Sequence, residues 1–220
     1  MTHSSAKLVL GSRSPRRLAL LKRLAPHITI EVRPPADATE ASFDNVHSLE
    51  QIEQQLLQIA RQKCEDVAQQ ISSQQSDSLI LTADTIIVAR NADHLPVVLG
   101  QPPETDNWQA TVRHWFRDYL LGKTHSVLTA LCVQPVPRER IEHIVRTDVT
   151  FRDDAEDLLE WYLATEEPRG KAGGYAIQEL GSLFVSRMEG SLTNVVGLPL
   201  ECLRDVLTSL ELNLNPPTES

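Results

Sequence analysis

The spacing of apolar residues along the chain predicts long helices and strands. Apolar residues recur in steps of three and four from Leu49 to Ile71, which is the period of a helix that buries one face. Leu79–Ala89 is a run of apolar and β-branched residues, as expected of a buried strand, and Asp84 is the one charge that interrupts it. Ser14 before Pro15 is typical of a helix start, because serine caps the first turn and proline fits its first position.

The other predicted elements are shorter. Strands are expected at Lys7–Gly11, Ile28–Val32, Val97–Val98, Ser126–Val133, Ile141–Phe151 and Leu183–Val185. Helices are expected at Pro103–Leu121, Asp154–Ala164 and Leu200–Leu210, loops at Gly170–Gly174 and Gly190–Pro199, and a polar tail at Asn213–Ser220. Strands and helices alternate, with a hairpin turn at Pro135–Pro137 among them, so we expect an α/β fold with a mixed central sheet.

Composition and charge narrow the class of protein. The 220 residues are 41% apolar and 23% charged, as in soluble globular domains, and suit one large domain or two small lobes. No apolar run approaches the ~20 residues of a membrane span, and the N-terminus lacks a secretory signal. The net charge of −9 argues against a general binder of nucleic acid or anionic membranes. Three distant cysteines predict reduced thiols in a cytoplasmic protein.

Basic residues gather at the N-terminus. Residues 1–30 hold six Lys or Arg and no Asp or Glu, although the chain as a whole is acidic. The segment from Ser12 to Arg17 lies between a predicted strand and a helix N-terminus, where free N–H groups and the helix dipole favour anions. Arg16 and Arg17 add bidentate donors for phosphate oxygens. The alternative is a solvated helix face whose arginines form surface ion pairs.

Other candidate residues are more ambiguous when taken singly. Asp84 is either a buried carboxylate satisfied by backbone donors or a metal ligand or general base that faces a cleft. Lys63 lies on the apolar side of the long helix and either extends to water or points at a phosphate. Lys171 and Gln178 flank a glycine loop, and the amide of Gln178 is suited to reading a base edge.

Taken in order, these segments resemble the Maf family, which is named for septum formation. The resemblance runs from about Leu8 to Leu207. It rests on SRSPRR at 12–17, ARQKC at 60–64, ADT at 83–85, GKTH at 122–125, TDVTF at 147–151, KAGGYAIQ at 171–178 and NVVGLPL at 194–200. The ordered co-occurrence of these motifs is more specific than any one of them.

The resemblance implies a nucleoside triphosphate pyrophosphatase, which releases a nucleoside monophosphate and pyrophosphate. It implies a mixed α/β sheet in two lobes around a deep cleft, spanning residues 1–212 as a single domain, and a possible homodimer. A divalent cation is implied, Mg²⁺ or alternatively Mn²⁺. The combination of SPRR, ADT and IQ resembles the branch that acts on dTTP and UTP.

The resemblance also assigns roles to residues of this chain. Asp84 matches the catalytic carboxylate and, with Glu40, the expected metal ligands. Base specificity is assigned to Arg16, Thr85 and Gln178, and phosphate binding to Ser12, Arg17, Lys63 and Lys171.

The chain departs from the family pattern at three positions. Gln101, Glu179 and Leu192 stand where Lys, Gly and Tyr are usual. The first two motivate an alternative, a nucleotide-binding regulatory protein linked to cell division that has lost turnover. A third hypothesis, an interaction factor without a ligand, leaves the Ser-Arg-Arg and Ala-Asp-Thr elements unexplained.

Overall fold

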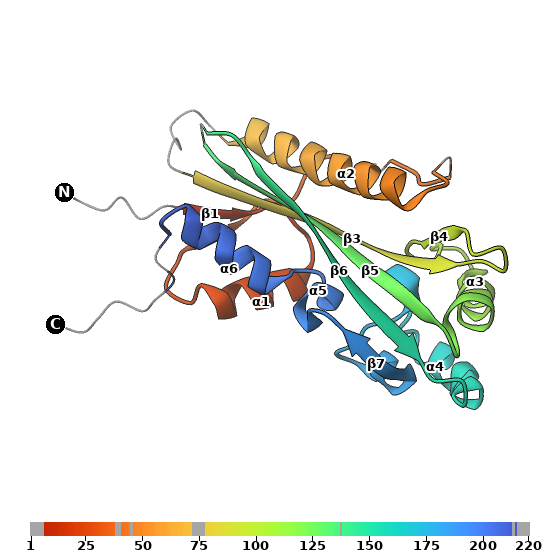
Figure 1. Ribbon diagram of the computed structural model, residues 1–220. Coiled ribbons are helices and arrows are strands. Elements are labelled where there is room, and N and C mark those ends of the chain that lie inside the picture. Colours follow the sequence, from red (N-terminus) through yellow and green to blue (C-terminus); the bar gives the residue numbers. More distant parts are fainter. Residues whose placement is uncertain are drawn as a thin grey trace, which may run out of the picture.

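The computed structural model describes residues 7–37, 41–44, 46–71, 78–136, 138–212 and 214, and a single seven-stranded sheet runs through this part of the chain (Figure 1). The strands are β1 (Lys7–Leu10), β2 (Ile30–Val32), β3 (Ser78–Arg90), β4 (Pro96–Leu99), β5 (Thr124–Pro135), β6 (Ile141–Phe151) and β7 (Val185–Glu189). The order is β2-β1-β3-β5-β6-β7, with β4 paired to β3. Because β1 is parallel to β2 and β3 while the remaining pairs are antiparallel, the predicted mixed α/β fold is confirmed.

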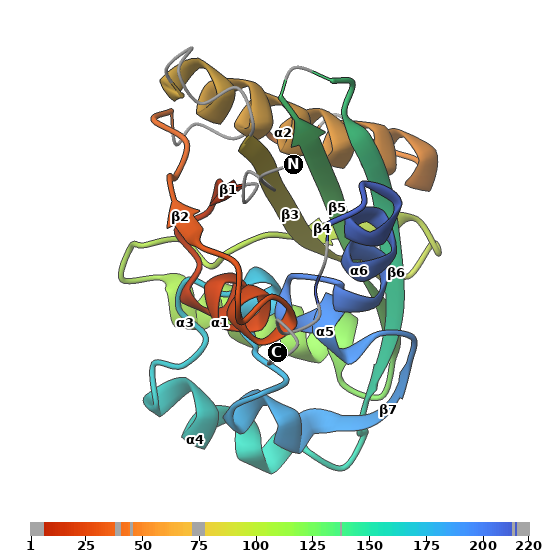
Figure 2. The same ribbon diagram turned by 90° about the vertical axis from the view of Figure 1, so that its left-hand side faces the viewer.

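Helices cover both faces of this sheet (Figure 2). The long helix α2 (Leu49–Gln70) buries its apolar face on one side, against residues of β3 and β5. Helices α1 (Pro15–Leu24) and α6 (Leu200–Ser209) pack on the opposite side. Helices α3 (Trp108–Trp115) and α4 (Leu159–Ala164) lie at the end of the sheet that carries β4 and β7, around an aromatic core.

One edge of β3 changes partner along its length. Its pairing with β1 ends at Leu81, which lies opposite Leu10, and its pairing with β4 begins at Ile87, opposite Leu99. On the other edge, β5 pairs with β3 without interruption from residue 79 to residue 88. Residues 82–86, called here the open segment, therefore have a neighbouring strand on one side alone.

Several predicted elements are wrong at their boundaries. The helix expected from Pro103 begins at Trp108, after a turn in which the Trp108 N–H donates to the Thr105 carbonyl, and continues as a π-helix over Phe116–Leu120. The strand expected at Leu183–Val185 is mostly a 3₁₀ helix, Leu180–Phe184, and β7 starts where that helix ends.

Two further segments differ in type. The expected loop at Gly190–Pro199 contains helix α5 (Leu192–Val196), because the Ser191 hydroxyl caps its first turn by accepting from the Asn194 N–H. The expected helix at Asp154–Ala164 opens with a 3₁₀ turn over Glu156–Leu158. Apart from Leu214, the predicted tail lies outside the described residues. Among the described helices, none combines the length and the apolar character needed to cross a bilayer.

Candidate active site

A cavity of about 590 Å³ lies beside the open segment of β3. Besides that segment, several parts of the chain enclose it: the loop from β1 into α1, the segment after β2, Lys63 of α2, the loops around Gly100 and Gly170–Tyr175, and the end of α5. Of the residues assigned by resemblance, the following line the cavity: Ser12, Arg16, Arg17, Lys63, Asp84 and Thr85. These residues come from three elements far apart in sequence, and the gap in the sheet is what brings them together.

Asp84 and Lys63 form an ion pair on the α2 side of the open segment. The Asp84 side chain is nearly buried, with 7% of the residue exposed, and its Oδ1 lies 2.6 Å from the Lys63 ammonium. A charge buried in an apolar strand is costly without a partner, and Lys63 offsets that cost. Asp84 lies mid-strand and on the cavity wall, so its position is the cleft-facing one of the two that the sequence left open.

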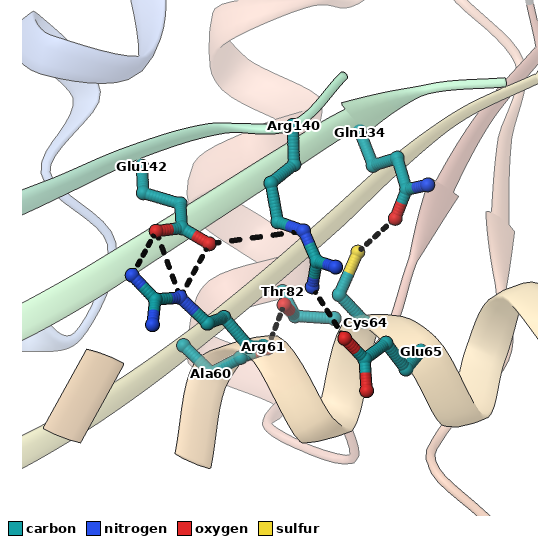
Figure 3. Close-up of polar contacts among 8 residues, drawn as sticks. All are labelled: Ala60, Arg61, Cys64, Glu65, Thr82, Gln134, Arg140 and Glu142. Carbon is teal, nitrogen blue, oxygen red and sulfur yellow. Dashed lines mark hydrogen bonds and ion pairs between the residues drawn. The ribbon is translucent and has the colours of Figure 1, made fainter. Parts of the chain in front are cut away.

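The position of Lys63 depends on the polar contacts between α2 and the sheet (Figure 3). Arg61, two residues before Lys63, makes a bidentate ion pair with Glu142 of β6, its Nη2 lying 2.6 Å from Oε2. The Thr82 hydroxyl of β3 donates to the Ala60 carbonyl at 2.8 Å. The Cys64 thiol, which follows Lys63, donates to the Gln134 side chain at 3.4 Å. With both flanking turns held, Lys63 is directed at Asp84.

The N-terminus of α1 opens onto the same cavity. The Ser14 hydroxyl caps the helix by accepting from the Arg17 N–H, and no acidic residue occupies the first turn. The Ser12 hydroxyl accepts from the Ser14 N–H at 3.1 Å, which folds the loop back over the helix end. Arg13 and Arg16 also line the cavity. The helix dipole and the arginines together make this wall suited to an anion.

Arg17 joins three walls of the cavity. Its guanidinium donates to the Gly197 carbonyl at the end of α5 (2.8 Å), to the Thr85 hydroxyl of β3 (3.0 Å) and to the Ser12 hydroxyl (3.4 Å). Gly197 caps α5 with φ of 116°, a backbone conformation that glycine adopts readily. Arg17 therefore holds the loop after β1, the open segment and α5 in one arrangement.

Lys171 and Gln178, two further predicted residues, lie elsewhere. They are not among the residues that line the cavity in the described part of the chain. Instead, the Lys171 ammonium lies 2.9 Å from the carboxylate of Glu179, one of the departures from the family pattern, and also bonds the Glu167 carbonyl. Gln178 is exposed. Glu40, assigned to the metal, lies outside the described residues.

Sequence reasoning also missed residues of the cavity wall. Asp37 contributes a second carboxylate, and Val195 to Gly197 contribute the end of α5. The signal for α5 was present, since a serine three residues before Asn194 can cap a helix that Gly197 ends. No group of three His, Cys, Asp or Glu side chains gathers around one point within the described ranges.

Tyr175 closes the apolar part of the cavity and is held by His125. The two side chains are buried, and the phenol oxygen lies 2.7 Å from His125 Nε2. Both rings pack edge-on against Phe151. Burial lowers the pKa of His125 to about 3 and raises the pKa of the Tyr175 phenol. Both groups are therefore neutral at physiological pH.

The buried His125 predicts a loss of stability in acid. Below pH 6.5 the unfolded chain protonates this imidazole, whereas the folded protein resists protonation down to about pH 3. We expect this group alone to lower the free energy of unfolding by roughly 3 kcal/mol between pH 7 and pH 4. Urea unfolding across that range, compared with His125→Gln, measures it. Equal pH slopes for the two proteins would contradict the prediction.

The comparisons with known proteins identify the family. A family model described as "Maf-like protein" matches residues 7–210. This chain belongs to the Maf family. The match covers the strand, loop and helix elements that enclose the cavity, so the predicted Maf resemblance is confirmed.

Relatives of this Maf protein cover nearly its whole length. A protein named "dTTP/UTP pyrophosphatase" from Caldicellulosiruptor bescii is 34% identical over 94% of this chain and 96% of its own. One of the same name from Moorella thermoacetica is 38% identical over 92% and 94%. A solved structure, a HAM1 protein from Coxiella burnetii, is 16% identical with a TM-score of 0.51, and covers 93% of this Maf chain and 99% of its own. That likeness concerns the fold.

Proposed function

We propose that this Maf protein hydrolyses nucleoside triphosphates, with dTTP and UTP preferred, to a nucleoside monophosphate and pyrophosphate. The observation that carries the proposal is the Asp84 carboxylate, fixed by Lys63 on the wall of a cavity that faces a helix N-terminus rich in arginine. The relatives named dTTP/UTP pyrophosphatase support the choice of substrate.

Each group has a chemical task in this reaction. Ser12, Arg16, Arg17 and Lys63 offer donors and positive charge for the phosphate oxygens, which stabilises charge that builds on the attacked phosphoryl group. Asp84 accepts the proton of the attacking water, and Lys63 orients its carboxylate. Thr85, Arg16 and Gln178 are assigned to the base, although Gln178 is exposed and would have to approach the bound nucleotide.

The residues present fit a divalent cation, for which we propose Mg²⁺, with Mn²⁺ as the alternative. The Asp84 carboxylate lies on the cavity wall, and Mg²⁺ is typically held by one or two carboxylates together with substrate phosphate oxygens. Glu40 is the second proposed carboxylate. When bound, the ion would supply positive charge to the phosphate oxygens.

The alternative of a protein without turnover gains no support from the geometry. Glu179, one of its motivations, pairs with Lys171, and neither residue is among those lining the cavity in the described chain. The Lys171–Glu179 ion pair does not involve Asp84, Lys63 or Thr85. The single domain over residues 1–212, the homodimer, the cytoplasmic location and a role in septum formation remain predictions.

Product analysis tests the proposed function. The purified chain is incubated with dTTP, UTP, CTP, GTP and ATP in the presence of Mg²⁺ or Mn²⁺, and nucleotide products and phosphate species are separated. The expected products are the monophosphate and pyrophosphate, formed fastest from dTTP and UTP. Release of orthophosphate with a diphosphate, or no turnover with any nucleotide, would reject the proposal.

Gln101 permits a test of the departure at that position. It lines the cavity and is exposed. Arg90 and Lys171 are two cations that could replace the usual lysine, but neither is among the described lining residues. Gln101→Lys is expected to raise kcat/KM for triphosphates about fivefold, since a lysine within ~4 Å of a phosphate contributes about 1 kcal/mol in water.

The gain from Gln101→Lys should shrink with added salt, because an exposed pair is screened. Gln101→Met, which adds no charge, is the matched control. An unchanged or lower kcat/KM on every triphosphate would show that the position does not lack a cation.

A further inference from the structure

The hydroxyl of Thr85 is the polar group that the open segment presents on the face opposite Asp84. Alternate residues of a strand point to the same face, so Thr85 shares its face with Ile87. Thr85 is half-buried and lines the cavity, while the residues on either side of it in β3 are buried. Its oxygen has two partners, Arg17 at 3.0 Å and the Thr129 hydroxyl at 2.9 Å.

These bonds form a chain with a defined direction. A guanidinium can only donate, so the Thr85 oxygen accepts from Arg17. At the other end, the Thr129 hydroxyl donates to the Asn194 carbonyl at 3.4 Å. Since Thr129 has a single proton, the bond between the two threonines is then donated by Thr85. Accepting from a cation polarises the Thr85 O–H and strengthens it as a donor, which favours the same direction.

Thr129 acts from behind the cavity wall. It is directly opposite Thr85 in the β3–β5 pairing and is fully buried. Its acceptor is held in place, because the buried Asn194 side chain donates to the Val127 carbonyl at 3.1 Å and to the Thr147 hydroxyl at 3.0 Å. Thr129 therefore influences a bound molecule only through Thr85.

The position of Thr85 corresponds to the base end of a bound nucleotide. Among the cations of the cavity, Arg13 lies at the helix N-terminus and Lys63 at the Asp84 pair, while Arg17 reaches from that helix to Thr85 itself. The apolar lining lies beyond Thr85, where Ile87 packs against the loop of Gly173 and Tyr175. A nucleotide with its phosphates at the cationic end places its ring against Thr85 and Ile87.

We propose that Thr129 is a positioning residue for base recognition. Because the Thr85 hydroxyl donates its proton to Thr129, Thr85 can only accept a hydrogen bond from a molecule bound in the cavity. The group that Thr85 accepts from is the ring N–H of a uracil or thymine base. Cytosine carries a lone pair at that ring nitrogen. It would face a lone pair of the Thr85 oxygen, and no hydrogen bond would form. The inference rests on the proposed function, and extends it from the substrate to the residue that sets the base preference.

The test compares Thr129→Val with Thr129→Ser in the full chain. Valine keeps the shape of threonine but cannot accept, so the Thr85 proton is free to turn into the cavity and to donate to the cytosine ring nitrogen. We expect the ratio of kcat/KM for UTP over CTP to fall at least tenfold in Thr129→Val. Thr129→Ser keeps the hydroxyl and is expected to keep the ratio within about threefold of the unaltered protein.

A purely structural role for Thr129 would lower kcat/KM for UTP and CTP together and leave their ratio unchanged, which would overturn the inference. A ratio that rises in Thr129→Val would mean that Thr85 donates to the base, and would overturn it as well. Calorimetric affinities for UMP and CMP give the same ratio without turnover. They test the role of Thr129 even if the protein hydrolyses no triphosphate. A failure of this inference is therefore distinguishable from a failure of the proposed function.

Discussion

Asp84→Asn is expected to lower pyrophosphate release by about 10²–10⁴-fold, the contribution typical of a general base, while the protein remains folded. The asparagine side chain has nearly the same shape but cannot take a proton from water, and it is a much weaker metal ligand. The change also leaves the Lys63 ammonium without its counter-charge. Because that ammonium lies on the cavity wall, water can solvate it, so we expect a modest loss of stability.

Asp148→Asn is the matched control for this prediction. Asp148 is another strand carboxylate, half-buried where Asp84 is buried, and it is paired with Arg146 at 2.9 Å and with the Ser126 hydroxyl at 2.7 Å. It is not among the residues that line the cavity beside the open segment in the described chain. It should retain turnover. Steady-state rates and circular dichroism on both variants make the comparison. A folded Asp84→Asn protein with near-normal rates would remove Asp84 from the proposed mechanism.

The sequence predicts the long elements of this fold because each carries many repeats of its own period. The steps of three and four over Leu49–Ile71 correspond to α2, and the apolar run at Leu79–Ala89 to β3. Five-residue α5 is too short for periodicity to distinguish from a loop, and tertiary packing over Asn194 supports it. Element type is thus predictable where the pattern is long, and packing decides it where the pattern is short.

The candidate site was predictable as a set of residues but not as an arrangement. Motif resemblance singles out Asp84 and Lys63, and their contact depends on how α2 lies across the sheet, which no local pattern encodes. The open segment results from where β1 ends and β4 begins, and strand ends are what sequence patterns define least. Lys171 shows the same limit, since its partner is Glu179, eight positions away, across a glycine loop.

Arg17 offers the second large effect. Arg17→Ala removes the bonds to the Gly197 carbonyl and to the Thr85 hydroxyl, and hydrogen bonds to a charged group contribute about 1.5–3 kcal/mol each. Because Arg17 is only half-buried, water replaces part of each bond, and we expect the free energy of unfolding to fall by about 2–4 kcal/mol, less than the sum of the two. We also expect kcat/KM to fall by roughly 10²-fold or more on every nucleotide, because the loop after β1, the open segment and the end of α5 are no longer held together by Arg17.

Two further variants distinguish this structural role of Arg17 from a simple effect of its charge. Arg16→Ala removes a neighbouring guanidinium of the same cavity, and should weaken triphosphate binding far more than nucleoside binding while leaving unfolding almost unchanged. Arg17→Lys keeps the positive charge but not the planar fork that reaches Gly197 and Thr85 together. If Arg17 acted chiefly as a charge beside phosphate, lysine would restore most of the activity. If it instead holds these segments together, Arg17→Lys should have the same free energy of unfolding and the same kcat/KM as Arg17→Ala, because an ammonium cannot bond Gly197 and Thr85 at once in the geometry of the guanidinium.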